Sequence, residues 1–301
     1  MKKLVLIDGH AILHRAYHAL PKTLTSKKGN PINAVYGFTS MILKVISDLE
    51  PSHIAVCFDR KEPTFRKKAF EDYQAHRPEM DKELEGQIDL VRKVVESFGI
   101  PIYEKAGYEA DDVIGTLSLH ATKNGFDEVD IVTGDRDILQ LVNNKVRVFL
   151  PIKGMSVGKL YGASDVIDKM KVNPAQIVDY KGLVGDPSDN YPGVKGIGPK
   201  TAESLLERYG SLEEIYKNLD ELEGSVKTKL EKSKKDAELS YKLAKIVTDV
   251  EIDADFEDMN DWSIGKQETI DLFKQIGFKT LTKRVQEMGK EMVEKQQGAL
   301  F

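Results

Sequence analysis

The first half of the chain alternates short apolar runs, rich in β-branched residues, with longer segments of helical period. The apolar runs cover residues 4–7, 53–58, 100–103, 128–133 and 146–150. Helical periodicity lies between them, at residues 33–49, 84–98 and 110–123. Because strands that alternate with helices in this way build parallel sheets, the sequence predicts an α/β fold, with a mostly parallel sheet covered by helices.

A second, helical region is predicted from the change of pattern beyond Pro151. Strand-like runs end there, and helical segments follow one another with short glycine, proline or asparagine breaks. Pro174 and Pro199 each stand where the first turn of a helix tolerates proline. A chain of 301 residues is long enough for two domains. We therefore predict a first domain over residues 1–170, a helical domain over 171–290, and a tail or linker over 291–301.

Acidic residues follow three of the predicted strands. Asp8 follows the first run, Asp59 the second, and Asp135 and Asp137 the fourth. The carboxyl ends of the strands in an open parallel sheet are where ligands collect. Any one of these aspartates could simply cap the next helix, but helix capping alone does not require an acid after each of three strands. These four carboxylates are therefore predicted to meet at one edge of the sheet.

Five further acids complete a set of nine. They are Glu109, Asp111 and Asp112 at a predicted helix start, and Asp186 and Asp189 in the stretch "GDPSDN". Gathered carboxylates repel one another unless cations lie between them. Oxygen ligands favour Mg²⁺ or Mn²⁺ over zinc, and nine acids suit two or three ions. Two such ions about 4 Å apart can hold a phosphodiester and activate a water molecule, so the sequence predicts metal-dependent phosphodiester hydrolysis.

Three histidines recur every four residues near the start of the chain, at His10, His14 and His18. This spacing places them on one helix face, where they could bind zinc. A zinc site would need a further ligand that the neighbouring sequence does not offer. Solvated or hydrogen-bonded histidines are the expected arrangement.

The stretch "GVKGIGPK", residues 193–200, is a glycine turn that leads into a helix. Backbone N–H groups at such a turn bind phosphate, and Lys195 and Lys200 beside it favour an anion. No strand precedes the turn, which argues against a dinucleotide-binding motif. The lysines of residues 225–235 either extend the same phosphate-binding track or form a solvated helix face. The alternative for the turn itself is a helix connection without a ligand.

Residues 60–77, "RKEPTFRKKAFEDYQAHR", combine basic side chains with aromatic rings. Phe65, Phe70 and Tyr73 are interleaved with the cations. Single-stranded nucleic acid binds to surfaces of this kind, because the charges attract the backbone and the rings stack on bases. A plain amphipathic helix has a similar composition, so this segment alone does not decide between the two.

Charge and cysteine content limit the surroundings of the protein. The chain has 44 Lys and Arg against 49 Asp and Glu, but outside the nine motif acids the basic residues outnumber the acids by 44 to 40. Net charge therefore does not exclude a nucleic-acid partner. The single Cys57 excludes an internal disulfide and favours a reducing cytoplasm. No apolar run is long enough to cross a membrane, and the start of the chain does not fit a signal peptide.

Taken together, the motifs resemble those of the 5′ nucleases or flap endonucleases, and most closely the 5′→3′ exonuclease domains at the front of bacterial DNA polymerases I. The matching stretches are "LIDGHAILHRAYHALP", "NAVYGFTSMI", "FDRKEPTFRKKAFEDYQAHRP", "GYEADDVIGTL", "TGDRDILQLV" and "GLVGDPSDNYPGVKGIGPKTA". They span roughly residues 4 to 210 in the family's order. All nine acidic positions of the family's motifs are present.

The resemblance implies a PIN-like nuclease core, a helical arch at about 60–98 and a helix-three-turn-helix at about 182–208. It assigns the nine acids to catalysis and metal binding: Asp8, Asp59, Glu109, Asp111, Asp112, Asp135, Asp137, Asp186 and Asp189. It assigns DNA binding to Arg15, Arg66, Lys67, Tyr73, Arg77, Gly193, Lys195, Gly196, Gly198 and Lys200. One position departs from the family, because Gln74 stands where members usually have lysine. We expect Lys67 or Lys68 to compensate in part.

The expected function is a structure-specific 5′→3′ exonuclease and 5′-flap endonuclease for DNA, acting in replication, by removing RNA primers or flaps, and in repair. The expected cofactors are two or three Mg²⁺ or Mn²⁺ ions, with a monovalent cation such as K⁺ at the helix-three-turn-helix turn. The expected partners are DNA with a 5′ flap, nick or junction, an RNA primer in a hybrid, and a polymerase domain. We expect a cytoplasmic, nucleoid-associated bacterial monomer. A weakened DNA-junction binding module and an RNA-directed nuclease are the alternatives.

Overall fold

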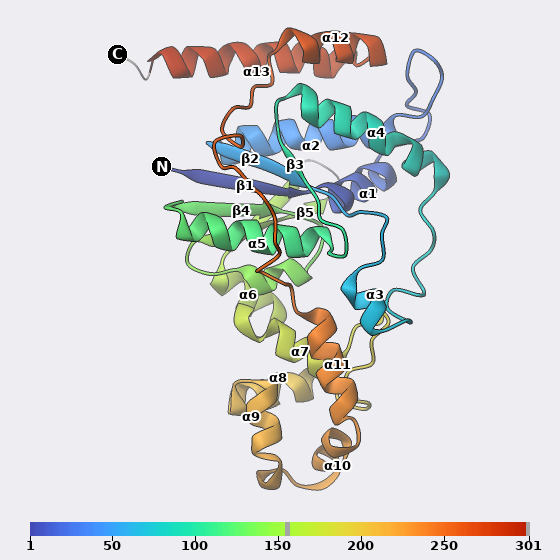
Figure 1. Cartoon of the computed structure of the whole chain (residues 1–301), viewed down its shortest axis with the longest axis vertical. Coiled ribbons are helices and arrows are strands. Elements are labelled where there is room, and N and C mark those ends of the chain that lie inside the picture. Colours follow the sequence, from blue (N-terminus) through green and yellow to red (C-terminus); the bar gives the residue numbers. More distant parts are fainter. Residues whose placement is uncertain (154–156, 299–301) are drawn as a thin grey trace.

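The centre of the molecule is a six-stranded sheet, seen in a computed structural model that describes residues 1–153 and 157–298 (Figure 1). Its strands are β1 (Lys3–Asp8), β2 (His53–Cys57), β3 (Ile102–Tyr103), β4 (Glu128–Val132), β5 (Val146–Lys153) and β6 (Val157–Tyr161), in the order β3-β2-β1-β4-β5-β6. All neighbouring strands are parallel except β5 and β6. The chain reverses its direction across the sheet between β1 and β4, the kind of position where ligands bind.

The predicted α/β class is confirmed, and the five predicted strands are present. The expectation that strands end near Pro151 is wrong, because β6 pairs with β5 at the edge of the sheet. The sequence of β6 contains Gly158 and Lys159, which are more typical of a turn. Gly158 is required there, because a Cβ atom at this position would lie 2.1 Å from the Phe149 ring on β5.

Helices cover both faces of the sheet. α5 (Ala110–Lys123) packs on one face, in a cluster with Leu4 and Leu6 of β1. α1 (Gly9–Ala19), α2 (Asn33–Leu49) and α4 (Lys82–Ser97) cover the other face, in a cluster with Val5 and Ile7. The four apolar side chains of β1, from Leu4 to Ile7, are at most 1% exposed, so the strand is buried on both sides. This burial explains the continuous apolar sequence of the strand.

The second region is helical and lies below the sheet in Figure 1. It contains α6 (Ala163–Met170), α7 (Ile177–Val184), α8 (Pro199–Tyr209), α9 (Leu212–Lys217), α10 (Gly224–Lys232) and α11 (Lys234–Ala244). Short 3₁₀ turns lie at Asp137–Leu141, Pro174–Gln176 and Leu219–Glu221. Between the sheet and this region, α3 (Phe65–Ala69) belongs to the long connection from β2 to α4.

The chain returns to the first region after α11. α12 (Gln267–Ile276) and α13 (Lys279–Gly298) lie over the face that α2 and α4 cover (Figure 1), and Phe273 and Val285 belong to the same buried cluster. The predicted division into residues 1–170, 171–290 and 291–301 stays a prediction. α13 extends to Gly298, so much of the expected tail is helical, and the last three residues lie outside the described part.

No helix in residues 1–153 and 157–298 is long and apolar enough to cross a membrane.

Candidate metal-dependent nuclease site

A cleft of about 1530 Å³ opens at the carboxyl ends of the central strands. Seven of the nine predicted acids line it: Asp8, Asp59, Glu109, Asp111, Asp135, Asp137 and Asp189. Asp112 and Asp186 are not among the lining residues. The predicted arch side chains Arg66, Tyr73, Gln74 and Arg77 line the same cleft, as does Arg15. The fold therefore brings acids from the strand ends and cations from the connection before α4 to one cavity.

Asp8 is the last residue of β1 and caps α1. Its Oδ1 accepts a hydrogen bond from the Ala11 N–H at 3.0 Å, and its Oδ2 accepts one from the Thr133 hydroxyl at 2.7 Å. The same hydroxyl oxygen accepts a hydrogen bond from the Asp135 N–H at 3.0 Å. Thr133 therefore links the acids at the ends of β1 and β4, and it is a site residue that the sequence reasoning missed.

Asp59 follows β2 and contacts both the first and the fifth helix. Its Oδ1 accepts a hydrogen bond from the Ala110 N–H at 2.8 Å, and its Oδ2 lies 3.2 Å from His10 Nδ1. Burial acts to raise the pKa of Asp59, but His10, the Ala110 N–H group and Arg77 together outweigh it, so the pKa is lowered. His10 thus belongs to the site: its Nδ1 accepts a hydrogen bond from the Asp59 backbone N–H at 3.1 Å and lies beside the Asp59 carboxylate.

Arg66 of α3 is buried and joins three parts of the chain. All five of its N–H donors have protein acceptors: both Asp112 oxygens at 2.7 and 2.8 Å, Glu109 Oε2 at 3.1 Å, and the carbonyl oxygens of Leu243 and Lys245 at 2.8 and 2.9 Å. Arg66 is 2% exposed and Asp112 is fully buried. DNA contact by Arg66 stays a prediction. In this structure, the guanidinium group holds α3, α5 and the end of α11 together.

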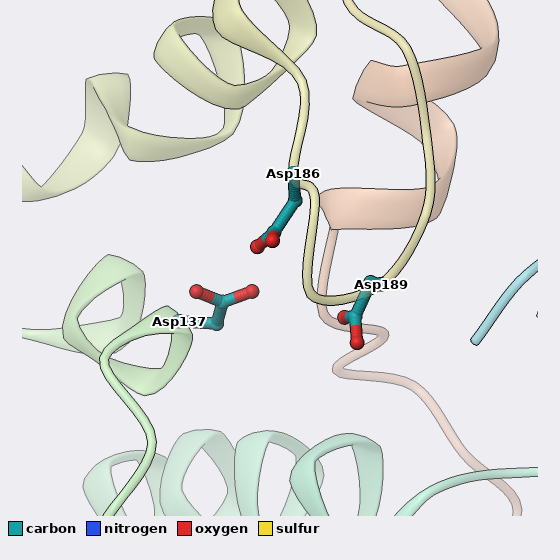
Figure 2. Close-up of side chains that lie close together, drawn as sticks. All are labelled: Asp137, Asp186 and Asp189. Atoms are coloured by element: carbon teal, nitrogen blue, oxygen red, sulfur yellow. The ribbon is translucent and has the colours of Figure 1, made fainter. Parts of the chain in front are cut away.

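Asp137, Asp186 and Asp189 form a second group of acids, with one carboxylate oxygen from each lying within 4.8 Å of the others. Figure 2 shows Asp137 facing Asp186, with Asp189 further along the same loop as Asp186. Lys181 Nζ pairs with Asp137 Oδ1 and lies 2.5 Å from Asp186 Oδ2. The sequence reasoning missed this lysine, whose only signal is its place five residues before Asp186 on a predicted helix.

Three residues of the predicted arch, Tyr73, Gln74 and Arg77, contact Asp189. The Arg77 guanidinium lies 2.5 Å from Asp189 Oδ1, the Gln74 side-chain amide donates to the same oxygen at 3.2 Å, and the Tyr73 hydroxyl donates to Oδ2 at 3.3 Å. Gln74 also donates its backbone N–H to the Asp189 carbonyl, with φ at +55°. The amide at position 74 therefore contacts an acid of the site. Lys67 Nζ instead binds the carbonyl oxygens of Glu71 and Tyr73.

The glycine turn before α8 is held in place by its buried apolar residues and by a contact with α10. Val194 and Ile197 are buried, while Lys195 and Lys200 are exposed on either side of Gly198. Gly193 has φ +60°, and a Cβ atom there would lie 2.2 Å from the Gly185 nitrogen. Lys229 of α10 donates to the Gly196 carbonyl at 3.0 Å, so the lysine-rich segment reaches the turn. Phosphate binding at Gly193, Lys195, Gly196, Gly198 and Lys200 stays a prediction.

Several carboxyl groups of the cleft have raised pKa values. Burial and the neighbouring Asp59 raise the pKa of Asp8 to about 7, and burial raises that of Glu109 to about 7. Burial, followed by Asp135 and Asp8, raises the pKa of Asp111 well above its ordinary value. Hard cations prefer such oxygen ligands and remove their mutual repulsion. The acids that line the cleft, together with the group of Asp137, Asp186 and Asp189, therefore form a donor set that fits divalent metal ions.

The raised pKa values predict how stability depends on pH when no metal is bound. A carboxyl group with a raised pKa binds a proton more readily in the folded state, so stability falls as the pH rises through that value. Between pH 6.5 and 8 we expect the free energy of unfolding in EDTA to fall by about 2 kcal/mol. Asp8 and Glu109 titrate in this window, whereas the lowered pKa of His14 acts below it. Urea titrations at each pH measure the change.

The matched control for this pH dependence is Asp8→Asn, which should reduce the slope because one of the titrating groups is gone. Excess Mg²⁺ should also reduce it, because a bound cation keeps the acids ionised. A free energy of unfolding that stays level or rises from pH 6.5 to 8 in EDTA would contradict the assignment.

Two family models together match most of the chain. The model described as "5'-3' exonuclease, N-terminal resolvase-like domain" matches residues 3–171, and "5'-3' exonuclease, C-terminal SAM fold" matches residues 172–269. The first model covers the sheet and the cleft acids up to Asp137. The second begins before α7 and covers Asp186, Asp189 and the glycine turn.

Curated relatives are similar over nearly the whole chain. DNA polymerase I of Caldicellulosiruptor bescii is 45% identical over 94% of this chain, and that of Bacillus subtilis is 41% identical over 95%. The chain spans about a third of the length of these polymerases, 33% and 32%. A 5'-3' exonuclease of Aquifex aeolicus is 40% identical over 86% of both chains.

Solved structures of low sequence identity share the fold. The T5 D15 protein co-crystallised with metal ions superposes with a TM-score of 0.65 at 18% identity, over 97% of this chain and 99% of that one. The catalytic core of Rad2 in complex with a DNA substrate superposes with a TM-score of 0.59 at 18% identity, over 95% and 90%. With its family-model matches and its relatives, the chain belongs to the 5′-3′ exonuclease family and is a nuclease, as its acidic motifs predict.

Proposed function

We propose that the chain is a metal-dependent, structure-specific nuclease that hydrolyses DNA as a 5′→3′ exonuclease and 5′-flap endonuclease. The observation that carries the proposal is a cleft lined by seven carboxylates and by the cations Arg15 and Arg77. The acids suit hard cations, and the cations suit a phosphate backbone. Removal of flaps and RNA primers in replication, and action in repair, follow from this activity.

The acids would hold two or three Mg²⁺ or Mn²⁺ ions in two groups. Asp8, Asp59, Asp111 and Asp135 form the group at the strand ends, and Asp137, Asp186 and Asp189 form the group that α7 and its following loop complete. A bound divalent ion would supply Lewis acidity to the phosphate and a lower pKa to its water. Asp112 and Glu109 would act through the Arg66 network, which fixes the start of α5 beside the site.

The remaining residues would position the nucleic acid. Arg77 is half exposed in the cleft, where its guanidinium can accept a phosphate in exchange for Asp189. The turn at residues 193–198 precedes the N-terminus of α8, where backbone N–H groups favour a phosphate, and a K⁺ ion at the turn would add charge there. Few residues separate this turn from Asp186 and Asp189. The length of this segment would therefore help to set the distance between the site that binds the duplex and the site of cleavage.

Cleavage of a labelled 5′-flap DNA with and without EDTA tests the function. We expect cleavage with Mg²⁺ or Mn²⁺, loss of cleavage in EDTA, and recovery on adding excess metal, because the acids alone cannot neutralise the phosphate. A nicked duplex and an RNA strand in a hybrid, offered in competition, measure substrate preference. Binding to the flap without cleavage under any metal would instead support a DNA-junction binding module, and preference for RNA an RNA-directed nuclease.

Three wider proposals follow from the family rather than from the cleft. The DNA polymerases I among the relatives suggest that the chain works beside a polymerase domain. Its nuclease region would act on DNA as a monomer. A cytoplasmic location near the nucleoid fits a DNA substrate. Analytical ultracentrifugation of the chain with and without flap DNA reports the oligomeric state.

A further inference from the structure

Lys181 lies between two of the proposed metal-holding acids. It projects from α7, and its ammonium group contacts Asp137 Oδ1 and Asp186 Oδ2, with the side chain only 13% exposed. Burial alone would lower the pKa of Lys181, but the neighbouring Asp137, Tyr191 and Asp186 together outweigh it and the pKa is raised. The ammonium group is therefore charged, and it occupies both the space and the electrostatic field that a cation would use at this pair of acids.

A buried hydroxyl group in the same cluster lacks a partner. Tyr191 is 3% exposed, and its hydroxyl makes no hydrogen bond within residues 1–153 and 157–298. Burial raises the pKa of Tyr191, and the charges that act on it most strongly are those of Lys181, Asp137 and Asp186. Buried hydroxyl groups normally have partners, so an unpaired one beside a charged cluster indicates a second arrangement of that cluster.

We propose that Lys181 is the resident counter-ion of the Asp137 and Asp186 pair, and that a divalent ion binds to this pair only by displacing its ammonium group. This inference rests on the proposed use of divalent ions. It adds that Lys181 sets the affinity of the ion site at Asp137 and Asp186. A single and a double positive charge a few ångströms apart repel each other too strongly to share the same two carboxylates. The Tyr191 hydroxyl oxygen is an acceptor for the displaced ammonium group.

Two consequences follow for the protein without DNA. Lys181 keeps the second group of acids from repelling one another when no ion is bound, so it stabilises the metal-free fold. It also weakens ion binding to Asp137 and Asp186, so this site fills at a higher metal concentration than the group at the strand ends. The opposite role, in which Lys181 holds the two carboxylates in place for the ion, predicts the opposite change in affinity.

Isothermal titration calorimetry with Mn²⁺, without DNA, separates the two roles. Lys181→Met keeps the length of the side chain and removes its charge. We expect the weaker Mn²⁺ site to bind about tenfold or more tightly in this variant, because a buried competing charge is gone. The matched control is Lys217→Met, because Lys217 also pairs with two acids, at 2.6 and 2.8 Å, but lies far from the cleft on α9. Unchanged or weaker Mn²⁺ binding in Lys181→Met would overturn the proposal.

Thermal unfolding gives a second readout of the same variant. In EDTA, Lys181→Met should unfold at a lower temperature than the wild type. Saturating Mn²⁺ should raise the unfolding temperature of Lys181→Met by more than it raises that of the wild type. The tighter binding should disappear in the double variant Lys181→Met with Asp137→Asn, which removes a ligand of the site. If the double variant still binds Mn²⁺ more tightly than the wild type, the gain in affinity arises at another site, which would contradict the proposal.

NMR of the wild type keeps the test possible if the variant fails to fold. In protein labelled with ¹³C at the lysine Cε, addition of Mg²⁺ should shift one buried lysine resonance, and Asp137→Asn should abolish that shift. A buried lysine resonance that stays fixed up to saturating Mg²⁺ would refute displacement. Failure of the proposed function looks different, because the wild type would then bind no Mn²⁺ and its cleavage of flap DNA would resist EDTA.

Discussion

Replacing Asp8 or Asp111 with asparagine should lower the single-turnover rate of flap cleavage by at least about 10³-fold while leaving DNA affinity nearly unchanged. Both carboxylates lie at the centre of the acidic group, where burial and the neighbouring acids raise their pKa values. Asparagine keeps the shape of the side chain but removes the charge that a divalent ion requires. Quench-flow cleavage assays at saturating enzyme measure the rate, and fluorescence anisotropy in Ca²⁺ measures binding.

The control for these two variants is Asp48→Asn, because Asp48 pairs with Lys44 on the outer surface of α2, away from the cleft. It should cleave at the wild-type rate. If Asp8→Asn keeps more than a tenth of the activity, the acid is not part of the metal site. If DNA binding falls as much as cleavage, the residue acts through substrate binding rather than through the reaction.

The arrangement of the acids at the strand ends could be predicted because it depends on local pattern. The apolar runs before Asp8 and Asp135 define buried parallel strands, and the carboxyl ends of such strands share one edge of the sheet. The start of α5 was predictable for the same reason, since Glu109 and Asp112 form a capping box at its N-terminus. These features need only neighbours in sequence and the handedness of the fold.

Contacts between distant segments could not be predicted in this way. Lys181 belongs to an ordinary helical pattern, and only the packing of α7 against the 3₁₀ turn at Asp137–Leu141 brings it to Asp137. The Gln74 amide meets Asp189 across 115 residues of sequence. β6 was missed because the space beside Phe149 demands glycine, which weakens the strand pattern. Each of these features depends on tertiary packing, which a single sequence does not display.

The Arg66 network shows how such contacts change the meaning of a motif residue. The resemblance to flap endonucleases counts Arg66 among the DNA-binding residues and Asp112 among the metal-holding acids. In the structure, both Asp112 oxygens accept hydrogen bonds from Arg66, and they also accept the N–H groups of Glu109 and Val247 at 3.0 and 2.8 Å. A carboxylate with this many donors already has its charge balanced. Replacing Asp112 should therefore affect mainly the stability of the fold.

Arg66→Met should lower the free energy of unfolding by about 3 to 5 kcal/mol, because it leaves Asp112 buried without its counter-ion. Asp112→Asn should cost a similar amount, since the guanidinium group would then lose its charged partner. Urea unfolding followed by circular dichroism measures both values. Lys67→Met is the matched control on the same helix. Lys67 is an exposed residue whose ammonium group binds carbonyl oxygens of its own segment, at Glu71 and Tyr73, so its charge should contribute less than about 0.5 kcal/mol.

The double variant of Arg66→Met with Asp112→Leu separates two explanations of the loss of stability. Either the ion pair itself stabilises the fold, or each single variant is destabilised because it leaves one buried charge without a partner. Removing both charges should restore part of the loss, because no buried ion then remains without a partner. The recovery should be partial, since the double variant still lacks the hydrogen bonds from Arg66 to the carbonyl oxygens of Leu243 and Lys245, which attach α3 to the end of α11. Single variants as stable as Lys67→Met would show that the network does not stabilise the fold and would contradict the prediction.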